Sequence, residues 1–128
     1  MTGYEVKIIE ASREFSAREK IKMKDLTNAF RLDQCIGDKG EPFILTPVAY
    51  AVLDITNERS KQDKEYRKYL IIDADGNKYH TGSESFWTSF KNIWDEMKEA
   101  GEDDYQIEVY NRESRNYAGK TFMSCSLV

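Results

Sequence analysis

The chain has 128 residues, enough for one domain but too few for two of ordinary size. Hydrophobic residues make up 40% and charged residues 33%, which is typical of a soluble globular protein rather than of a disordered or fibrous chain. No stretch reaches the roughly 20 apolar residues of a membrane helix, and the N-terminus shows no secretory signal, so we expect a cytoplasmic protein.

The N-terminal half predicts mainly strands. Residues 4–10 alternate well enough for a short strand. The basic segment 18–24 is read as a second strand because its apolar residues occupy alternate positions. Residues 25–41 carry a Gly-Asp-Lys-Gly run, which is typical of a loop. A long, largely apolar strand is then expected over 48–55.

The C-terminal half predicts a hairpin, one helix and two further strands. Residues 66–81 read as two strands joined by an Asp-Gly turn, which supplies positive φ angles. Apolar residues then recur at helical spacing over 86–97, and Gly101 is placed to stop that helix. Alternating strands over 105–109 and 123–127 close the chain.

Three strands, a helix and a final hairpin follow one another in the OB-fold, a five-stranded partly open barrel with its helix between strands 3 and 4. We therefore expect a mainly β protein in which residues 1–128 form a single OB-fold domain. Residues 1–17 would add an extra N-terminal strand or an arm. An α+β two-layer sandwich fits the same order of elements and remains an alternative.

Charge is unevenly distributed, although the net charge of the chain is only −4. Residues 59–68 contain five cations and two carboxylates, and residues 112–120 contain three cations and one carboxylate. Residues 95–104 instead hold six carboxylates and one lysine. A molecule polarised in this way can present a positive groove to phosphates.

Binding of a single strand without sequence preference requires rings that stack on bases and cations that follow phosphates. Both basic segments interleave the two residue types, and they map to the strand 2–3 face and the loop between strands 4 and 5, where OB-folds bind oligonucleotides. Tyr50 is expected on the outer face of the long apolar strand. The candidate binding residues are Tyr50, Arg59, Lys61, Lys64, Tyr66, Arg67, Lys68, Tyr69, Tyr79, Tyr110, Arg112, Arg115, Tyr117 and Lys120.

Several segments carry a family resemblance. They are residues 20–25 (KIKMKD) with 28–33 (NAFRLD), residues 79–87 (YHTGSESFW), and residues 117–127 (YAGKTFMSCSL). Together with the strand–turn–strand over 66–81, they resemble the small single-stranded DNA-binding proteins of phages and prophages of Gram-positive bacteria. The resemblance implies an OB-fold and a role in covering exposed single strands during replication or recombination in the bacterial host cell.

A calcium-binding loop at 73–84 is one alternative. Oxygen-bearing side chains occupy positions 1, 3, 5, 7, 9 and 12 of an EF-hand-like loop: Asp73, Asp75, Asn77, Tyr79, Thr81 and Glu84. Lys78, however, stands at position 6, where the loop requires glycine, and a β-hairpin at Asp75-Gly76 explains the same residues.

Catalysis finds little support in the sequence. His80 is the single histidine and reads as a hydrogen-bonded strand residue, while Cys35 and Cys125 lack metal-ligand spacing. Cys125 reads as a buried structural thiol. Phe86, Phe90 and Trp94 are expected in the core, and Trp87 is expected to pack between the helix and the sheet.

We therefore expect a non-enzymatic protein without a cofactor that binds single-stranded DNA without strong sequence preference. Replication or recombination proteins and further copies of the chain are additional candidate partners. The remaining alternative is a small protein-interaction module that binds through its acidic helix end at residues 95–104.

Overall fold

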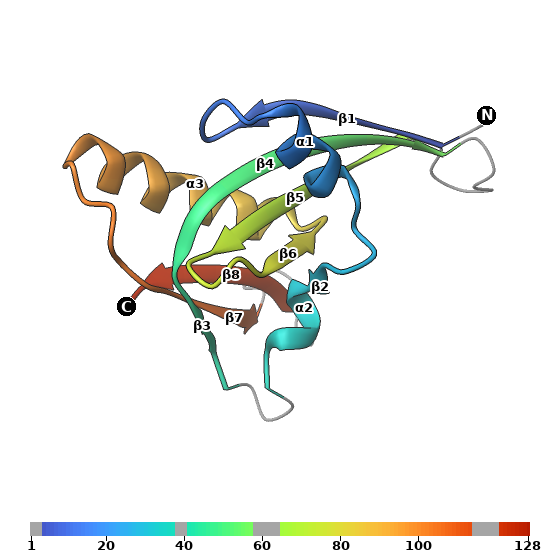
Figure 1. Cartoon of the computed structure of the whole chain (residues 1–128). Helices are drawn as coiled ribbons and strands as arrows, with labels where there is room; N and C mark the ends of the chain where they lie inside the picture. The colour runs from blue at the N-terminus through green and yellow to red at the C-terminus, as the bar shows by residue number, and fades with distance from the viewer. Residues whose placement is uncertain (1–3, 38–40, 58–64, 114–120) are drawn as a thin grey trace.

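The computed structural model describes residues 4–37, 41–57, 65–113 and 121–128. Within these ranges the chain forms eight strands and three helices, and the strands are arranged as two open sheets (Figure 1). The mainly β character expected from the sequence is confirmed. The expectation of a single helix is wrong, and the sheets do not close into one barrel.

The larger sheet has five strands, and each neighbouring pair is antiparallel except β6–β2, which is parallel. In spatial order the strands are β1 (Tyr4–Ala11), β4 (Pro47–Asn57), β5 (Glu65–Asp73), β6 (Lys78–Thr81) and β2 (Phe30–Arg31). The expected N-terminal strand is thus present as β1, at one edge of the sheet. Its pairing with β4 is irregular between Ile8 and Glu10.

The smaller sheet contains β3 (Phe43–Leu45), β7 (Ile107–Glu113) and β8 (Thr121–Leu127), with β7 in the centre. Only Thr46 separates β3 from β4, so one continuous stretch of chain enters both sheets. The carbonyl oxygen of Thr46 accepts a hydrogen bond from the backbone N–H of Ala74 at 3.0 Å. The junction between the sheets is therefore held to the end of β5.

Helix α3 (Glu84–Glu99) is the helix predicted from the spacing of its apolar residues. The hydroxyl of Ser83 caps its start by accepting a hydrogen bond from the N–H of Phe86 at 3.2 Å. Gly101 follows its end with φ +75°, a backbone conformation that glycine adopts without steric cost. No helix in the described residues is both long enough and apolar enough to span a membrane.

The prediction of a strand over 18–24 is wrong, because this segment forms helix α1 (Ala17–Lys24). Its start is fixed by a capping box: the Ser16 hydroxyl accepts from the N–H of Glu19 at 3.2 Å, and the Glu19 carboxylate accepts from the N–H of Ser16 at 2.9 Å. The loop expected over 25–41 also contains the short strand β2 and helix α2 (Leu32–Cys35).

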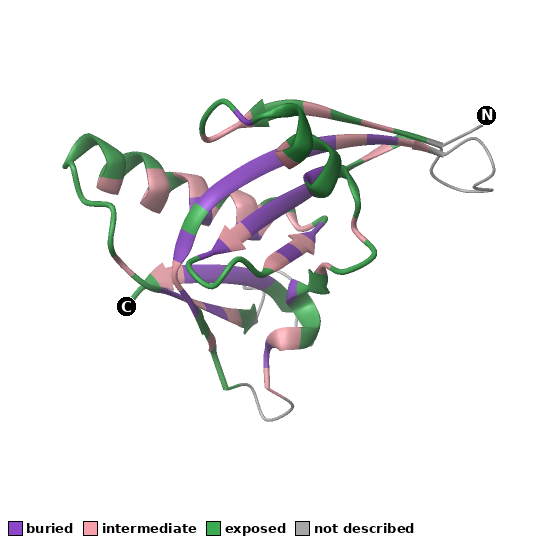
Figure 2. Ribbon diagram, in the orientation of Figure 1, coloured by how far each residue is buried: buried purple, intermediate pink, exposed green. Residues whose placement is uncertain are grey.

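The larger sheet buries apolar side chains on both of its faces. Consecutive residues of β4 and of β5 are accordingly coloured as buried in Figure 2. On one face, which we call the α3 face, Tyr50 and Ile71 pack with Phe86 and Phe90 of α3 and with β7 and β8. On the opposite face, the α1 face, the buried side chains are Phe15, Met23, Ala49, Ala51, Leu53, Ile55 and Leu70. The continuous apolar run of β4 is explained by this two-sided burial.

Helix α1 is attached to the sheet at its C-terminal end as well as through Met23. The Lys78 ammonium group, on β6, donates hydrogen bonds to the carbonyl oxygens of Lys22 at 2.7 Å and Asp25 at 2.8 Å. A cation at a helix C-terminus stabilises the helix by satisfying its last carbonyl groups. Helix α1 is therefore held on this face of the sheet by Met23 in the core and by Lys78 at its C-terminal end.

Candidate nucleic-acid interface

Three tyrosines that the sequence offered as stacking surfaces are buried. Tyr50, Tyr69 and Tyr79 are only 5%, 4% and 7% exposed. The ring of Tyr69 stacks on Trp87 of α3 with centroids 4.6 Å apart, and Tyr50 meets the same indole edge-on at 5.1 Å. The expectation that Tyr50 lies on an open outer face is wrong, because α3 covers that face. The packing roles expected for Trp87, Phe86 and Phe90 are confirmed.

The hairpin between β5 and β6 accounts for the residues that resembled a calcium loop. One carboxylate oxygen of Asp73 accepts hydrogen bonds from the N–H groups of Asp75 and Asn77, and the other accepts from the hydroxyl of Tyr79. Gly76 takes the positive φ of the turn, at +86°. No three His, Cys, Asp or Glu side chains converge among the described residues, so the calcium-loop interpretation has no geometric support.

Within β5, the predicted binding residues do not share one face of the strand. Tyr66 is half-buried and packs on the α1 face. Arg67 is exposed and forms an ion pair with Asp54 at 3.3 Å, on the opposite side of the strand from its neighbour Lys68. Six predicted residues lie outside the described part of the chain: Arg59, Lys61, Lys64, Arg115, Tyr117 and Lys120.

A groove of about 410 Å³ lies between the end of β6 and the start of β8, and we call it the β6–β8 groove. These two strands belong to different sheets, and β2 pairs only with Tyr79 and His80 of β6. The groove therefore occupies an opening between the sheets. Its lining includes Arg31, Lys68, His80, Ser83, Thr121 and Phe122.

Two cations flank His80 in this groove. Arg31 on β2 lies directly opposite His80 in the strand pairing. On the other side, His80 pairs with Leu70 of β5, and Lys68 lies two residues before Leu70 on the same face of that strand. Arg31 also pairs with Asp33 at 3.2 Å. Burial lowers the pKa of His80, and the nearby positive charges of Lys68 and Arg31 lower it further, whereas Asp33 acts in the opposite direction.

The side chain of His80 contradicts the expectation of a fully hydrogen-bonded strand histidine. Its Nδ1 atom is buried and has no hydrogen-bond partner among the described residues. A buried polar atom without a partner costs about 1–3 kcal/mol. Because Nδ1 is buried, a group bound in the groove would contact another part of the imidazole, and His80 belongs to the candidate site through its place in the groove lining.

The wall of the groove is fixed by hydroxyl groups around the start of α3. The hydroxyl of Thr81 accepts from the N–H of Ser83 at 3.1 Å, and the hydroxyl of Ser85 donates to the carbonyl oxygen of Met123 at 2.8 Å. The second bond joins the first turn of α3 to β8. The N-terminal end of a 16-residue helix thus borders the groove, and its dipole favours a negatively charged ligand.

An exposed ring extends the groove onto the smaller sheet. Phe122 lines the groove and is 37% exposed. Arg112 is its register partner on β7, with the guanidinium 5.9 Å from the ring centroid. Tyr110 follows on the same face, and its hydroxyl shares a hydrogen bond with that of Ser126. We call Tyr110, Arg112 and Phe122 the hairpin strip.

The sequence reasoning named Tyr110 and Arg112 but missed Phe122, Arg31 and His80 as groove residues. The exposure of Phe122 could have been predicted from the sequence. Met123 and Cys125 lie at alternate positions that point into the core, so Phe122 points to the other face of the strand. Arg31 had no comparable signal, since its place beside His80 depends on a parallel pairing between residues nearly 50 positions apart.

Both cysteines are free, and neither lies in this groove. Cys125 is buried in the core, as expected, and burial raises the pKa of its thiol to about 12. Its packing is that of a structural residue.

Comparisons with known proteins give no family assignment. No protein-family model matches the chain, and neither the curated proteins nor the solved structures gave a match.

Proposed function

We propose that the protein binds single-stranded DNA, without strong sequence preference, along the β6–β8 groove and the hairpin strip. One observation supports this most directly: the exposed ring of Phe122 lies between the groove, which holds Arg31 and Lys68, and Arg112 on β7. Cations that follow the phosphates and a ring that stacks on a base are the two components of single-strand binding.

The order of strand pairing supports an OB-fold as the scaffold of this site. The β3–β4 stretch corresponds to a first strand shared by two sheets, followed by β5, β6, helix α3, β7 and β8. In this proposal the barrel is open between its third and fifth strands, β6 and β8, and β1, α1 and β2 are additions. The opening coincides with the groove.

The chemistry of binding is electrostatic and stacking, with no bond made or broken. Phosphate oxygens in the groove would accept hydrogen bonds from Arg31, Lys68 and the imidazole of His80. Release of counterions from the DNA would make affinity fall as salt increases. A base on Phe122 would contribute about 1–3 kcal/mol, largely regardless of its identity. The biological role would be protection of exposed strands during replication or recombination.

The test is fluorescence anisotropy with a labelled oligo-dT, in which Lys68→Gln is compared with Arg67→Gln. The two residues are adjacent on β5 but lie on opposite faces, so each substitution removes one charge and only the first alters the groove. Lys68→Gln is expected to weaken binding by several fold, and Phe122→Ala by about tenfold, equivalent to about 1.4 kcal/mol.

The control Arg67→Gln is expected to bind as the wild type does. The proposal would be overturned by a wild-type protein that does not bind oligo-dT at low salt. It would also be overturned if Arg67→Gln weakened binding as much as Lys68→Gln, because the charges would then act only through the net charge of the protein.

A further inference from the structure

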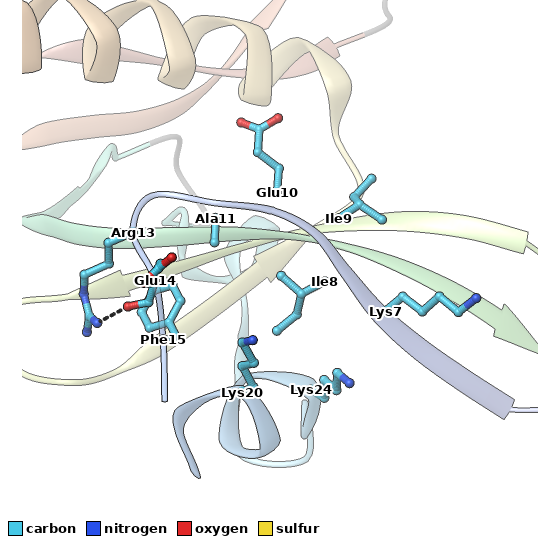
Figure 3. Close-up of a pocket in the computed structure, with 10 residues that line it drawn as sticks. All are labelled: Lys7, Ile8, Ile9, Glu10, Ala11, Arg13, Glu14, Phe15, Lys20 and Lys24. Atoms are coloured by element: carbon cyan, nitrogen blue, oxygen red, sulfur yellow. Dashed lines mark hydrogen bonds between the residues drawn. The ribbon is translucent and has the colours of Figure 1, made fainter. Parts of the chain in front are cut away.

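A second, larger groove lies at the N-terminal part of the chain. It has a volume of about 750 Å³ and lies between β1 and α1, so we call it the β1–α1 groove (Figure 3). Ile8 and Phe15 contribute apolar surface to it. Lys20 and Lys24, one helical turn apart, line it from α1, and Lys7 lines it from β1.

The three lysines of this groove are mostly uncommitted, and of its two carboxylates Glu10 is engaged elsewhere, while Glu14 forms no ion pair among the described residues. Among the described residues, Lys20 and Lys24 form no ion pair, and Lys7 forms only a long, exposed one with Glu5 at 3.9 Å. The carboxylate of Glu10 points away from α1 in Figure 3 and interacts with Lys91 and the Tyr50 hydroxyl instead. The groove therefore presents three lysines to a ligand.

The ring in this groove does not suit a nucleic acid. Phe15 is only 8% exposed, and the guanidinium of Arg13 covers it at 4.1 Å from the ring centroid. No open aromatic face is thus available for a base, and the carboxylate of Glu14 also lines the groove. Lysines around an apolar floor instead fit a protein segment that carries several carboxylates.

The chain itself has such a segment at the C-terminal end of α3. The end of this helix projects beyond the sheets in Figure 1, and every carboxylate residue in it is exposed. These residues, which we call the acidic end, are Asp95, Glu96, Glu99, Glu102, Asp103 and Asp104. Within the described residues only Asp95 has an ion pair, with Lys91 at 3.1 Å.

Apolar groups accompany these charges. Trp94 and Tyr105 are half-buried beside the acidic end, and with Val48, which is 48% exposed, they line a small recess of about 250 Å³. The acidic end therefore combines carboxylates with partly exposed apolar surface, as the β1–α1 groove combines lysines with an apolar floor.

We propose that the β1–α1 groove binds the acidic end of a second copy of this chain. The two surfaces are different parts of the molecule, so the contact is head-to-tail, and any assembly that does not close into a ring has one groove and one acidic end free. The product is a chain of protomers that grows with protein concentration and weakens as salt screens the charges. This inference does not depend on DNA binding.

The test uses two variants that each neutralise one surface. The groove variant carries Lys7→Gln, Lys20→Gln and Lys24→Gln, and the acidic-end variant carries Glu99→Gln, Glu102→Gln and Asp103→Asn. Neutral replacements are chosen because reversed charges would create a new complementary pair. Sedimentation velocity without DNA, at an ionic strength of about 0.02 M, measures the oligomeric state of each.

The wild type is expected to form oligomers whose mass rises with concentration, and each variant alone is expected to be monomeric. An equimolar mixture should give a one-to-one dimer and nothing larger, because only one intact groove and one intact acidic end can meet. The dimer should dissociate at about 0.3 M salt.

The proposal is overturned if the wild type remains monomeric at low salt or if the mixture gives no dimer. It is also overturned if the groove variant loses oligo-dT affinity while the wild type is monomeric, since the groove would then belong to a DNA path. Unfolding of the groove variant is checked by circular dichroism. The single substitution Lys24→Gln, which should weaken association partly, serves as the milder second variant.

Discussion

Tyr69 and Trp87 stack with their ring planes inclined by only 10°, and this pair joins β5 to helix α3. Because the pair is buried, the phenol of Tyr69 contributes to folding rather than to ligand contact. Tyr69→Ala is expected to lower the free energy of unfolding by about 3 kcal/mol, as for other large aromatic side chains removed from a core. Urea denaturation measures the change.

The comparison for this substitution is Phe122→Ala, which removes an exposed ring and should change the free energy of unfolding by less than about 1 kcal/mol. A Tyr69→Ala protein that kept its wild-type stability but failed to bind oligo-dT would place Tyr69 in the interface and contradict the burial described above.

Removing a carboxylate from the β6–β8 groove should strengthen DNA binding. Asp33 pairs with Arg31 beside the groove, so Asp33→Asn frees the guanidinium and removes a charge that repels phosphate. We expect oligo-dT affinity to increase severalfold at low salt, and the gain to shrink as salt is added. Anisotropy titrations at two salt concentrations give both values.

The matched control is Asp54→Asn, which frees Arg67 on the opposite face of β5 in the same way. Its net charge is identical to that of Asp33→Asn. Equal gains from the two substitutions would show that total charge, rather than the groove, determines binding.

The titration of His80 should make stability depend on pH. Burial and two nearby cations lower the pKa of His80 in the folded protein below that of the unfolded chain, which is about 6.5. The unfolded state then binds a proton more readily, so the contribution of His80 is fully present above that pH and is lost as pH falls below it. Urea unfolding midpoints at pH 8 and pH 5 are the measurement.

His80→Gln should show a smaller loss of stability between these two pH values, because it cannot take up the proton. If both proteins lose the same free energy of unfolding, other groups account for the whole pH dependence. Bound phosphate should counteract Arg31 and Lys68 and raise the pKa of His80, so oligo-dT is expected to bind more tightly to the wild type as pH falls toward 5.

The capping box of α1 should be needed to keep the N-terminal segment on the sheet. Ser16→Ala removes the acceptor for the Glu19 N–H and is expected to cost about 1 kcal/mol of stability. Arg13 and the Ser16 N–H lower the pKa of Glu19 to about 2, so its carboxylate retains its capping role until the pH falls toward that value. Ser16→Asp, which keeps an acceptor, should restore stability above pH 4.

Hydrogen exchange gives a local measurement for the same variant. The N–H of Lys20, which donates to the carbonyl oxygen of Ser16 at 2.9 Å, should exchange faster in Ser16→Ala. Unchanged exchange at this position, together with unchanged stability, would show that the packing of Met23 and the hydrogen bonds from Lys78 hold the helix without the cap.

Local sequence signals predicted the elements whose pattern is unambiguous. Helix α3 has helical spacing, a capping serine and a terminating glycine, and the hairpin at Gly76 has a turn that glycine favours. The prediction of a strand over 18–24 was wrong because it relied on the alternation of Ile21 and Met23. In the structure Ile21 is 69% exposed and only Met23 is buried. The capping box at Ser16 and Glu19 was the stronger signal, and it indicates a helix.

The candidate site was harder to predict, because the alternation of side chains along a strand does not tell which face of the sheet is open. Both faces of β4 are covered, one by α3 and the other by α1, so Tyr50 has no open side to occupy. Which helix covers which face is decided by contacts distant in sequence. The groove beside His80 likewise arises from the pairing of β2 with β6, and no local pattern marks it.

The two sheets are joined through the chain at Thr46 but not by a strand pair beside the groove. Among the described residues β6 and β8 share no backbone hydrogen bonds. The core that Tyr50 and Ile71 share with Ile107 and Val109 holds the sheets together instead, and the bond from Ser85 to Met123 ties α3 to β8. The width of the groove is therefore set by the same side chains that stabilise the fold, and widening it would expose part of the core.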